Sequence, residues 1–145
     1  TEPFQIMKSI FTILALSFSA ITTSVFAADE EYPDISIKDL KKAIAEGTVL
    51  LIDVNGTKSY SKGHLPGAID FRKNEDQLAA VLPKDKKMLI VAYCGGPSCT
   101  AYQAGINEVR KLGFTNVVHF SGGISGWIGA GEKIDDAKSK SDPEV

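Results

Sequence analysis

Two nearly uninterrupted apolar runs constrain the fold of this chain more than any other feature. One is TVLLIDV at residues 48–54, and the other is MLIVAY at residues 88–93. A strand that is apolar at consecutive positions is buried on both faces, which is typical of a parallel sheet covered by helices. Weaker runs, GAIDF at 67–71 and NVVHF at 116–120, repeat the pattern. We therefore predict a mostly parallel sheet.

Helical patterns separate these apolar runs. The segment SIKDLKKAIAEG places Ser36 at the N-cap of an amphipathic helix and Gly47 at its C-terminal stop. Residues 75–82 (EDQLAAVL) and 100–113 (TAYQAGINEVRKLG) are predicted to be helical as well. Strands that alternate with helices in this way indicate an α/β domain.

The length of the chain fits one domain. Its 145 residues, 43% of them hydrophobic, are enough to bury a single core of ordinary size. We expect this domain at residues 28–131 and a polar, disordered tail at residues 132–145. Sixteen basic residues against eighteen acidic ones give a net charge of -2, which supplies no electrostatic reason to bind nucleic acid or an anionic membrane.

The N-terminal segment is predicted to be a targeting signal. Residues 7–27 (MKSIFTILALSFSAITTSVFA) combine Lys8, an apolar stretch and small residues near the end, as a secretory signal peptide does. An uncleaved anchor or a buried helix is the alternative, but the apolar stretch is shorter than the ~20 residues that span a bilayer. Cleavage near Ala28 would leave a periplasmic protein without a membrane segment. Residues 1–6 do not fit a signal and are expected to be a cloning remnant.

The two cysteines of the chain lie close together in YCGGPSCT. Cys94 ends an apolar strand, and function in parallel sheets concentrates at the carboxyl ends of strands. Gly95 and Gly96 leave backbone amides uncovered, and a helix that begins near Thr100 would direct its N–H groups to the same place. Such an anion cradle lowers the pKa of a thiol and makes Cys94 a candidate nucleophile. The alternative is a buried cysteine that only ends a core strand.

Three stretches of the chain resemble the rhodanese family of sulfurtransferases. They are LLIDVNGTKSYSKGHLPGAIDF at 50–71, MLIVAYCGGPSCT at 88–100 and LGFTNVVHFSGGISGW at 112–127. They follow the order and the approximate spacing of the family, and with the joining segments they cover nearly all of residues 36–131. The GHLPGA and GGISGW motifs, with a cysteine-ended strand between them, form a specific combination.

The resemblance implies a single domain with a five-stranded parallel sheet and helices on both faces. It implies that Cys94 takes a sulfane sulfur from a donor, forms a persulfide and passes the sulfur to a thiol or cyanide, without a cofactor or a metal. Expected donors are polysulfide, thiol persulfide or thiosulfate, and a sulfur-relay protein is a further expected partner. The substrate-binding loop would consist of Gly95, Gly96, Pro97, Ser98, Cys99 and Thr100.

The chain departs from the family pattern at three points. Asp53 matches the acidic residue of a D-x-R motif, but Asn55 stands where the arginine is usual, so the ion pair of that motif is expected to be missing. The 95–100 loop has no Lys or Arg, which disfavours thiosulfate as the donor. The interval from Cys94 to Gly113 is slightly longer than in compact rhodaneses and resembles related phosphatases, whose loops end with an arginine that Thr100 cannot replace.

The remaining candidate residues have two interpretations each. Cys99 either attacks the persulfide, releases sulfide and leaves a disulfide, or is a small packing residue. His64 in GHLPGA is expected to order a turn, with substrate contact as the alternative, and His119 is expected to be a strand residue. No zinc site is expected, because the Cys and His spacings do not match known zinc motifs. A binding module that only carries sulfur and a thiol oxidoreductase that uses both cysteines remain alternatives to a sulfurtransferase.

Overall fold

The computed structural model describes residues 32–136. The signal peptide predicted at residues 7–27 and most of the predicted tail lie outside the described residues. Within residues 32–136, no helix is long and apolar enough to cross a membrane. The helices and strands, in chain order, are α1 (Ile37–Glu46), β1 (Val49–Asp53), α2 (Thr57–Tyr60), β2 (Ile69–Asp70), α3 (Phe71–Asn74), the 3-10 turn η1 (Glu75–Gln77), α4 (Leu78–Val81), β3 (Leu89–Tyr93), α5 (Tyr102–Lys111), β4 (Val117–His119) and α6 (Gly123–Gly129).

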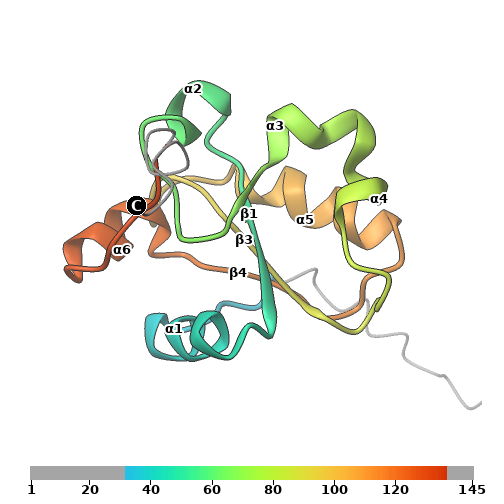
Figure 1. The fold of residues 1–145 in the computed structure, drawn as a ribbon, viewed down its shortest axis with the longest axis horizontal. Helices are drawn as coiled ribbons and strands as arrows, with labels where there is room; N and C mark the ends of the chain where they lie inside the picture. The colour runs from blue at the N-terminus through green and yellow to red at the C-terminus, as the bar shows by residue number, and fades with distance from the viewer. Residues whose placement is uncertain (1–31, 137–145) are drawn as a thin grey trace, which may run out of the picture. The chain divides into compact units, whose positions relative to one another are not determined.

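The four strands of the described residues form one parallel sheet in the order β2-β1-β3-β4 (Figure 1). Strands β1 and β3 pair along their whole length, from Val49 opposite Leu89 to Asp53 opposite Tyr93. The predicted α/β class, a parallel sheet with helices, is therefore confirmed. All four strands end at the same edge, which brings Asp53 and Tyr93 together beside the cysteine loop.

The predicted count of five strands is wrong for the part of the chain that the structure describes. The segment before α1 runs beside β4 but makes only a single parallel bridge, between Asp34 and His119. Two hydrogen bonds define it, from the Ile35 amide to the His119 carbonyl (2.9 Å) and from the His119 amide to the Pro33 carbonyl (2.8 Å). Pro33 has no N–H to extend the ladder, so the segment does not become a strand.

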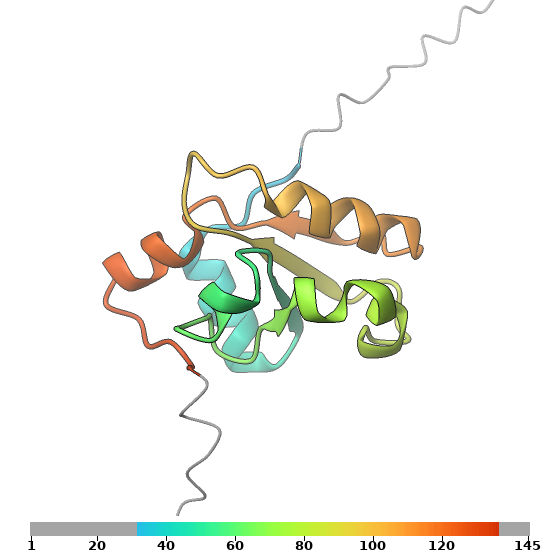
Figure 2. The same ribbon diagram turned by 90° about the horizontal axis from the view of Figure 1, so that it is seen from above.

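Two apolar layers cover the sheet, because alternate strand residues face opposite sides. Leu51, Val91 and Tyr93 face Leu40 of α1 and Trp127 of α6. Ile52, Ile90 and Ala92 face the other layer, which holds Phe71, Leu78, Ile106 and Val109 from α3, α4 and α5. Figure 1 shows α1 and α6 on one side of the strands and α3, α4 and α5 on the other, and Figure 2 shows α5 running along β3 and β4.

The predicted helices form with one interruption. In α1, the Ser36 side chain accepts a hydrogen bond from the Asp39 amide, and Gly47 ends the helix in the left-handed region (φ 66°). The single helix predicted at residues 75–82 is instead the 3-10 turn η1 followed by α4. The backbone of Gln77 (φ −127°, ψ 21°) departs from helical values and separates the two.

Residues 132–136 lie against the domain, although the sequence assigns them to the polar tail. The Trp127 indole N–H donates to the Lys133 carbonyl (2.7 Å). His64 and Asp135 exchange two backbone hydrogen bonds of 2.9 Å in an antiparallel bridge. These contacts hold residues 132–136 against the domain.

Candidate active site around the Cys94 loop

The loop from Cys94 to Thr100 follows β3 at the carboxyl edge of the sheet. Cys94 directly follows the last residue of the buried strand β3 and is only 2% exposed. Cys99 is half-buried, and Pro97, Ser98 and Thr100 are exposed. A disulfide joins Cys94 to Cys99, with the two Cα atoms 6.3 Å apart. The structure therefore brings the two candidate cysteines together in the oxidised state.

Helix α6 holds this loop in place. The Ile124 amide donates to the Cys94 carbonyl (2.9 Å), and the Ser125 amide donates to the Gly95 carbonyl (3.1 Å). Gly123 lies in the left-handed region (φ 57°), and a Cβ atom there would lie 2.5 Å from the Cys94 carbonyl oxygen and 2.6 Å from the Gly96 nitrogen. No residue other than glycine fits this approach.

The GGISGW motif thus positions the cysteine loop. Trp127 of this motif is buried. The contact with the loop was missed because it joins segments that are nearly thirty residues apart in the chain. The signal that could have found it is Gly123 itself, since paired glycines often mark a close approach of two backbones.

The loop retains unused hydrogen-bond donors. Its Cys99 amide is already bonded to the Gly96 carbonyl (2.9 Å). Among the described residues, no acceptor is bonded to the amides of Gly95, Gly96 and Ser98. Helix α5 begins at Tyr102, two residues later than predicted. Three N–H groups of the loop therefore have no acceptor among the described residues, as the amides of an anion-binding loop would before an anion binds.

The two cysteines of the disulfide differ in burial. A thiolate must reach the sulfur that it attacks and displace the other sulfur along the S–S axis. Cys94 is almost fully enclosed, whereas Cys99 is partly exposed. Cys99 is therefore the more accessible of the two residues to an incoming thiol.

Asp53 is fully buried next to the loop and is held by two donors. The Tyr93 hydroxyl donates to its carboxylate (2.6 Å), and the Asn55 amide donates to the other oxygen (2.8 Å). Burial raises the pKa of Asp53, and the hydrogen bond from Tyr93 opposes that rise. Burial and the nearby Asp53 carboxylate raise the pKa of Tyr93, so this hydroxyl stays protonated as a donor. It also accepts a hydrogen bond from the Leu65 amide (2.9 Å).

Asn55 occupies the position of the usual arginine and does not replace its charge. Within residues 32–136, no cation forms an ion pair with Asp53. The Asn55 side-chain oxygen lies 3.7 Å from the position that a Cβ atom would take on Gly95. Its side-chain nitrogen is buried without a partner. The side chain therefore borders the loop as a neutral neighbour.

His64 lies in the turn after α2 and contacts Tyr60. The two rings stack with centroids 3.7 Å apart, and Nδ1 of His64 donates to the Tyr60 carbonyl (2.9 Å). His64 is 1% exposed, and its Nε2 has no partner. His119 stacks on Tyr102 instead, with centroids 4.2 Å apart. In the part of the chain that the structure describes, no three His, Cys, Asp or Glu residues are grouped as metal ligands.

Comparisons with known proteins agree with this architecture. The family model described as Rhodanese-like domain matches residues 36–130. The BH2092 protein from Bacillus halodurans superimposes with a TM-score of 0.64 at 24% identity, covering 79% of this chain and 84% of that one. The human single-domain sulfurtransferase TSTD1 gives a TM-score of 0.55 at 24% identity, covering 67% of this chain and 96% of that one.

A curated relative resembles the chain over part of its own length. The HTH-type transcriptional regulator Rv0324 of Mycobacterium tuberculosis is 34% identical over 104 residues, which are 70% of this chain and 44% of that protein. The chain thus spans less than half of this relative. The family match covers the whole sheet, the cysteine loop and α6. The chain belongs to the rhodanese-like domain family.

Proposed function

We propose that this domain is a sulfurtransferase in which Cys94 carries a sulfane sulfur as a persulfide. The observation that carries the proposal is the position of Cys94, which directly follows a buried strand of a rhodanese-like domain and begins a loop with free amides. A persulfide anion needs donors that compensate for its loss of water, and the amides of Gly95, Gly96 and Ser98 supply them.

Reduction of the disulfide precedes transfer. One thiol attacks the Cys99 sulfur, forms a mixed disulfide with it and releases the Cys94 thiolate. A second thiol then attacks the mixed disulfide, so that Cys99 returns to a thiol and the two small thiols leave as one disulfide. Two electrons pass from the small thiols to the protein.

Transfer then proceeds in two displacements at sulfur. The Cys94 thiolate attacks the outer sulfur of a thiol persulfide or polysulfide. A new S–S bond forms on Cys94, the S–S bond of the donor breaks, and the donor thiolate leaves and takes up a proton. An acceptor thiolate or cyanide next attacks the outer sulfur of the Cys94 persulfide and regenerates the Cys94 thiolate.

The donor and the location are further parts of the proposal. Because residues 95–100 and Asn55 carry no positive charge, the loop compensates poorly for desolvation of the thiosulfate dianion. Polysulfide or a thiol persulfide is therefore the proposed donor. The signal-like segment at residues 7–27 supports a periplasmic location, where a disulfide such as Cys94–Cys99 persists.

The disulfide also favours a second candidate function, a thiol oxidoreductase that cycles both cysteines. Production of thiocyanate from polysulfide and cyanide separates the two. A sulfurtransferase loses this activity in Cys94→Ser and keeps it in Cys99→Ala, since only one sulfur carries the product. If Cys99→Ala abolishes the activity as completely as Cys94→Ser, the pair acts as a dithiol and the oxidoreductase is the function. If neither variant changes thiocyanate production, the proposed role of Cys94 is wrong.

A further inference from the structure

An apolar hollow lies beside the cysteine loop and is used by none of the steps above. Ile128 (51% exposed) and Ile134 (37% exposed) are two of the three large apolar side chains that are exposed among the described residues. Both line the same pocket, which has a volume of about 290 Å³ and also contains Ile124. Exposed apolar side chains that gather at a concave site are typical of a ligand pocket.

The walls of this pocket are attached to the loop itself. Ile124 and Ile128 are four residues apart on α6, so they lie on one face of that helix. The Ile124 amide is bonded to the Cys94 carbonyl. On the other side, Asn55 lines the pocket and borders Gly95. The pocket therefore adjoins the backbone of the Cys94 loop through Ile124 and Asn55.

The position of Ile134 is also well defined. Its Cδ1 atom would be 2.5 Å from a Cβ atom on Gly63, so the absence of a side chain at Gly63 admits it. The bridge between His64 and Asp135 holds the next residue of the chain. The apolar wall is therefore part of the fold and is present before a ligand binds.

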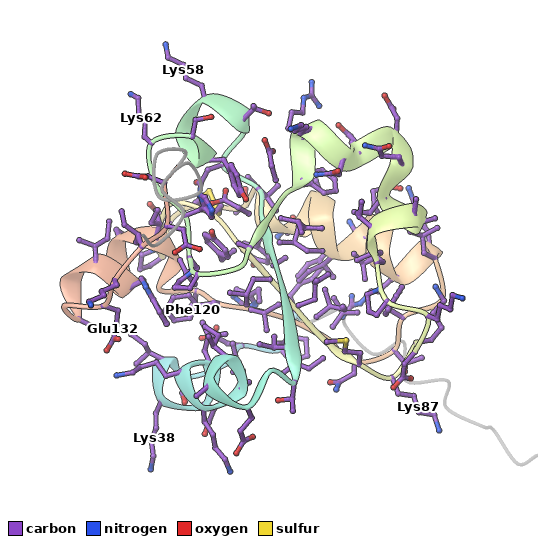
Figure 3. The ribbon with its side chains drawn as sticks, viewed as in Figure 1. Lys38, Lys58, Lys62, Lys87, Phe120 and Glu132 are labelled. Atoms are coloured by element: carbon purple, nitrogen blue, oxygen red, sulfur yellow. A yellow bond between two sulfur atoms is a disulfide. The ribbon has the colours of Figure 1, made fainter. Side chains whose placement is uncertain are left out.

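Lys62 is the one charged residue that lines this pocket. Its ammonium group forms no ion pair with any residue of the described chain, whereas Lys41, Lys42 and Lys111 each pair with a glutamate. Figure 3 shows Lys58 and Lys62 projecting from the same part of the domain, on and just after α2. The pocket thus combines an apolar wall with a single uncompensated positive charge.

We propose that this pocket selects the sulfur donor, binding a low-molecular-weight thiol persulfide with a short apolar chain and an anionic end. The chain packs against Ile124, Ile128 and Ile134, and the anionic end pairs with Lys62. The inference rests on the proposed function, since it names the donor of the same reaction. The Cys94 thiolate takes the outer sulfur, the S–S bond of the donor breaks, and the remaining thiol leaves the pocket with a proton.

The volume favours a small molecule over a protein as the occupant. A pocket of about 290 Å³ is at the lower end of the range for small-molecule sites. A persulfide on a partner protein would need a broad contact surface, because specific protein interfaces bury about 800 Å² on each partner. A protein-bound persulfide as the occupant predicts that only a protein donor distinguishes Lys62→Gln from Lys58→Gln.

The test compares kcat/KM for three donors after reduction of the protein: inorganic polysulfide, the persulfide of 4-mercaptobutanoate and the persulfide of butanethiol. Lys62→Gln is expected to lower kcat/KM about threefold to fivefold for the carboxylate donor alone, as an exposed ion pair would. Ile128→Ser is expected to lower it about tenfold for both chain-bearing donors and to leave polysulfide unchanged. Lys58→Gln is the matched control, because it removes a charge from α2 without lining the pocket.

The possible results are distinguishable. The pocket assignment is wrong if kcat/KM falls equally in Lys62→Gln and Lys58→Gln, or if the enzyme shows no preference for the chain-bearing donors. In either case, transfer from polysulfide still supports the proposed function. If only a protein-bound persulfide separates Lys62→Gln from Lys58→Gln, the pocket is part of a protein-docking face and the small-molecule assignment is wrong. If no donor places sulfur on Cys94, the proposed function fails, and the inference fails with it.

Discussion

Replacement of Tyr93 by phenylalanine is expected to destabilise the domain strongly and to make its stability more dependent on pH. The hydroxyl joins two buried groups, because it donates to the Asp53 carboxylate and accepts from the Leu65 amide. Phenylalanine keeps the ring and removes both hydrogen bonds. The cavity that it leaves is too small to admit water freely, so the carboxylate and the amide both lose a partner.

The expected loss in the free energy of unfolding is about 3–5 kcal/mol. A buried group without its hydrogen-bond partner costs about 1–3 kcal/mol, and the charged carboxylate lies at the upper end of that range. A domain of this size is stable by about 5–15 kcal/mol, so the variant retains only part of its stability near neutral pH. Urea unfolding of the disulfide-bonded protein measures this difference.

The pH dependence has a definite sign. The folded-state pKa of Asp53 is raised above its value of 3.8 in the unfolded chain, mainly by burial. Its stability contribution is therefore fully present below that value and is lost as the pH rises through the folded-state pKa. Loss of the Tyr93 hydrogen bond raises this pKa further. Tyr93→Phe is thus expected to cost more at about pH 7 than at about pH 4, where Asp53 becomes protonated.

Tyr60→Phe provides the control. The Tyr60 hydroxyl donates to the Ala68 carbonyl (2.6 Å), which is an uncharged partner. Its loss is expected to cost about 1 kcal/mol, with little change between the two pH values. If Tyr93→Phe costs no more than Tyr60→Phe, or costs the same at both pH values, then the Tyr93–Asp53 hydrogen bond does not stabilise the edge of the sheet.

Three further predictions concern the loop and its donor. Gly123→Ala is expected to lower the free energy of unfolding by about 1–3 kcal/mol and to slow sulfur transfer, because its Cβ would meet the Cys94 carbonyl. Gly126→Ala in the same helix is the control, since a Cβ there meets nothing within 4 Å. Equal urea midpoints for the two variants would contradict this prediction. Sulfur transfer by Cys99→Ala should no longer require prior reduction of the protein. The prediction is refuted if added thiol activates this variant as strongly as it activates the unaltered protein. Steady-state kinetics should give a higher kcat/KM for polysulfide than for thiosulfate, and the reverse order would contradict the role assigned to the uncharged loop.

Local and periodic signals in the sequence predict most of the fold. The apolar runs around β1 and β3 identify the central strands because strands buried on both faces need apolar residues at every position. Ser36 and Gly47 mark the two ends of α1, and each does so through hydrogen bonds with residues nearby in the sequence. The prediction of a fifth strand is wrong because a strand needs a continuous ladder of backbone hydrogen bonds. Pro33, which lies beside β4, has no N–H group and interrupts that ladder.

The candidate site is only partly accessible to the same reasoning. The spacing of Cys94 and Cys99 allows a disulfide, but the pairing depends on the curvature of the loop. That curvature is held by hydrogen bonds from helix α6, which lies far from the loop in the sequence. The Tyr93–Asp53 contact comes from strand register, which the apolar pattern does not determine at single-residue precision. The pocket is lined by Ile128, Ile134 and Lys62, which come from separate segments of the chain. No local sequence pattern indicates that these segments meet.

The mass of the intact protein after exposure to a sulfur donor tests directly whether Cys94 carries sulfur. The protein is first reduced to open the Cys94–Cys99 disulfide, the reductant is removed, and polysulfide or a thiol persulfide is added. If Cys94 carries the sulfur, the protein gains one sulfur atom, which peptide mapping locates on Cys94. This sulfur is retained in Cys99→Ala and lost when cyanide is added. A reduced protein that gains no sulfur from either donor, or gains it equally in Cys94→Ser, would show that Cys94 is not the sulfur carrier.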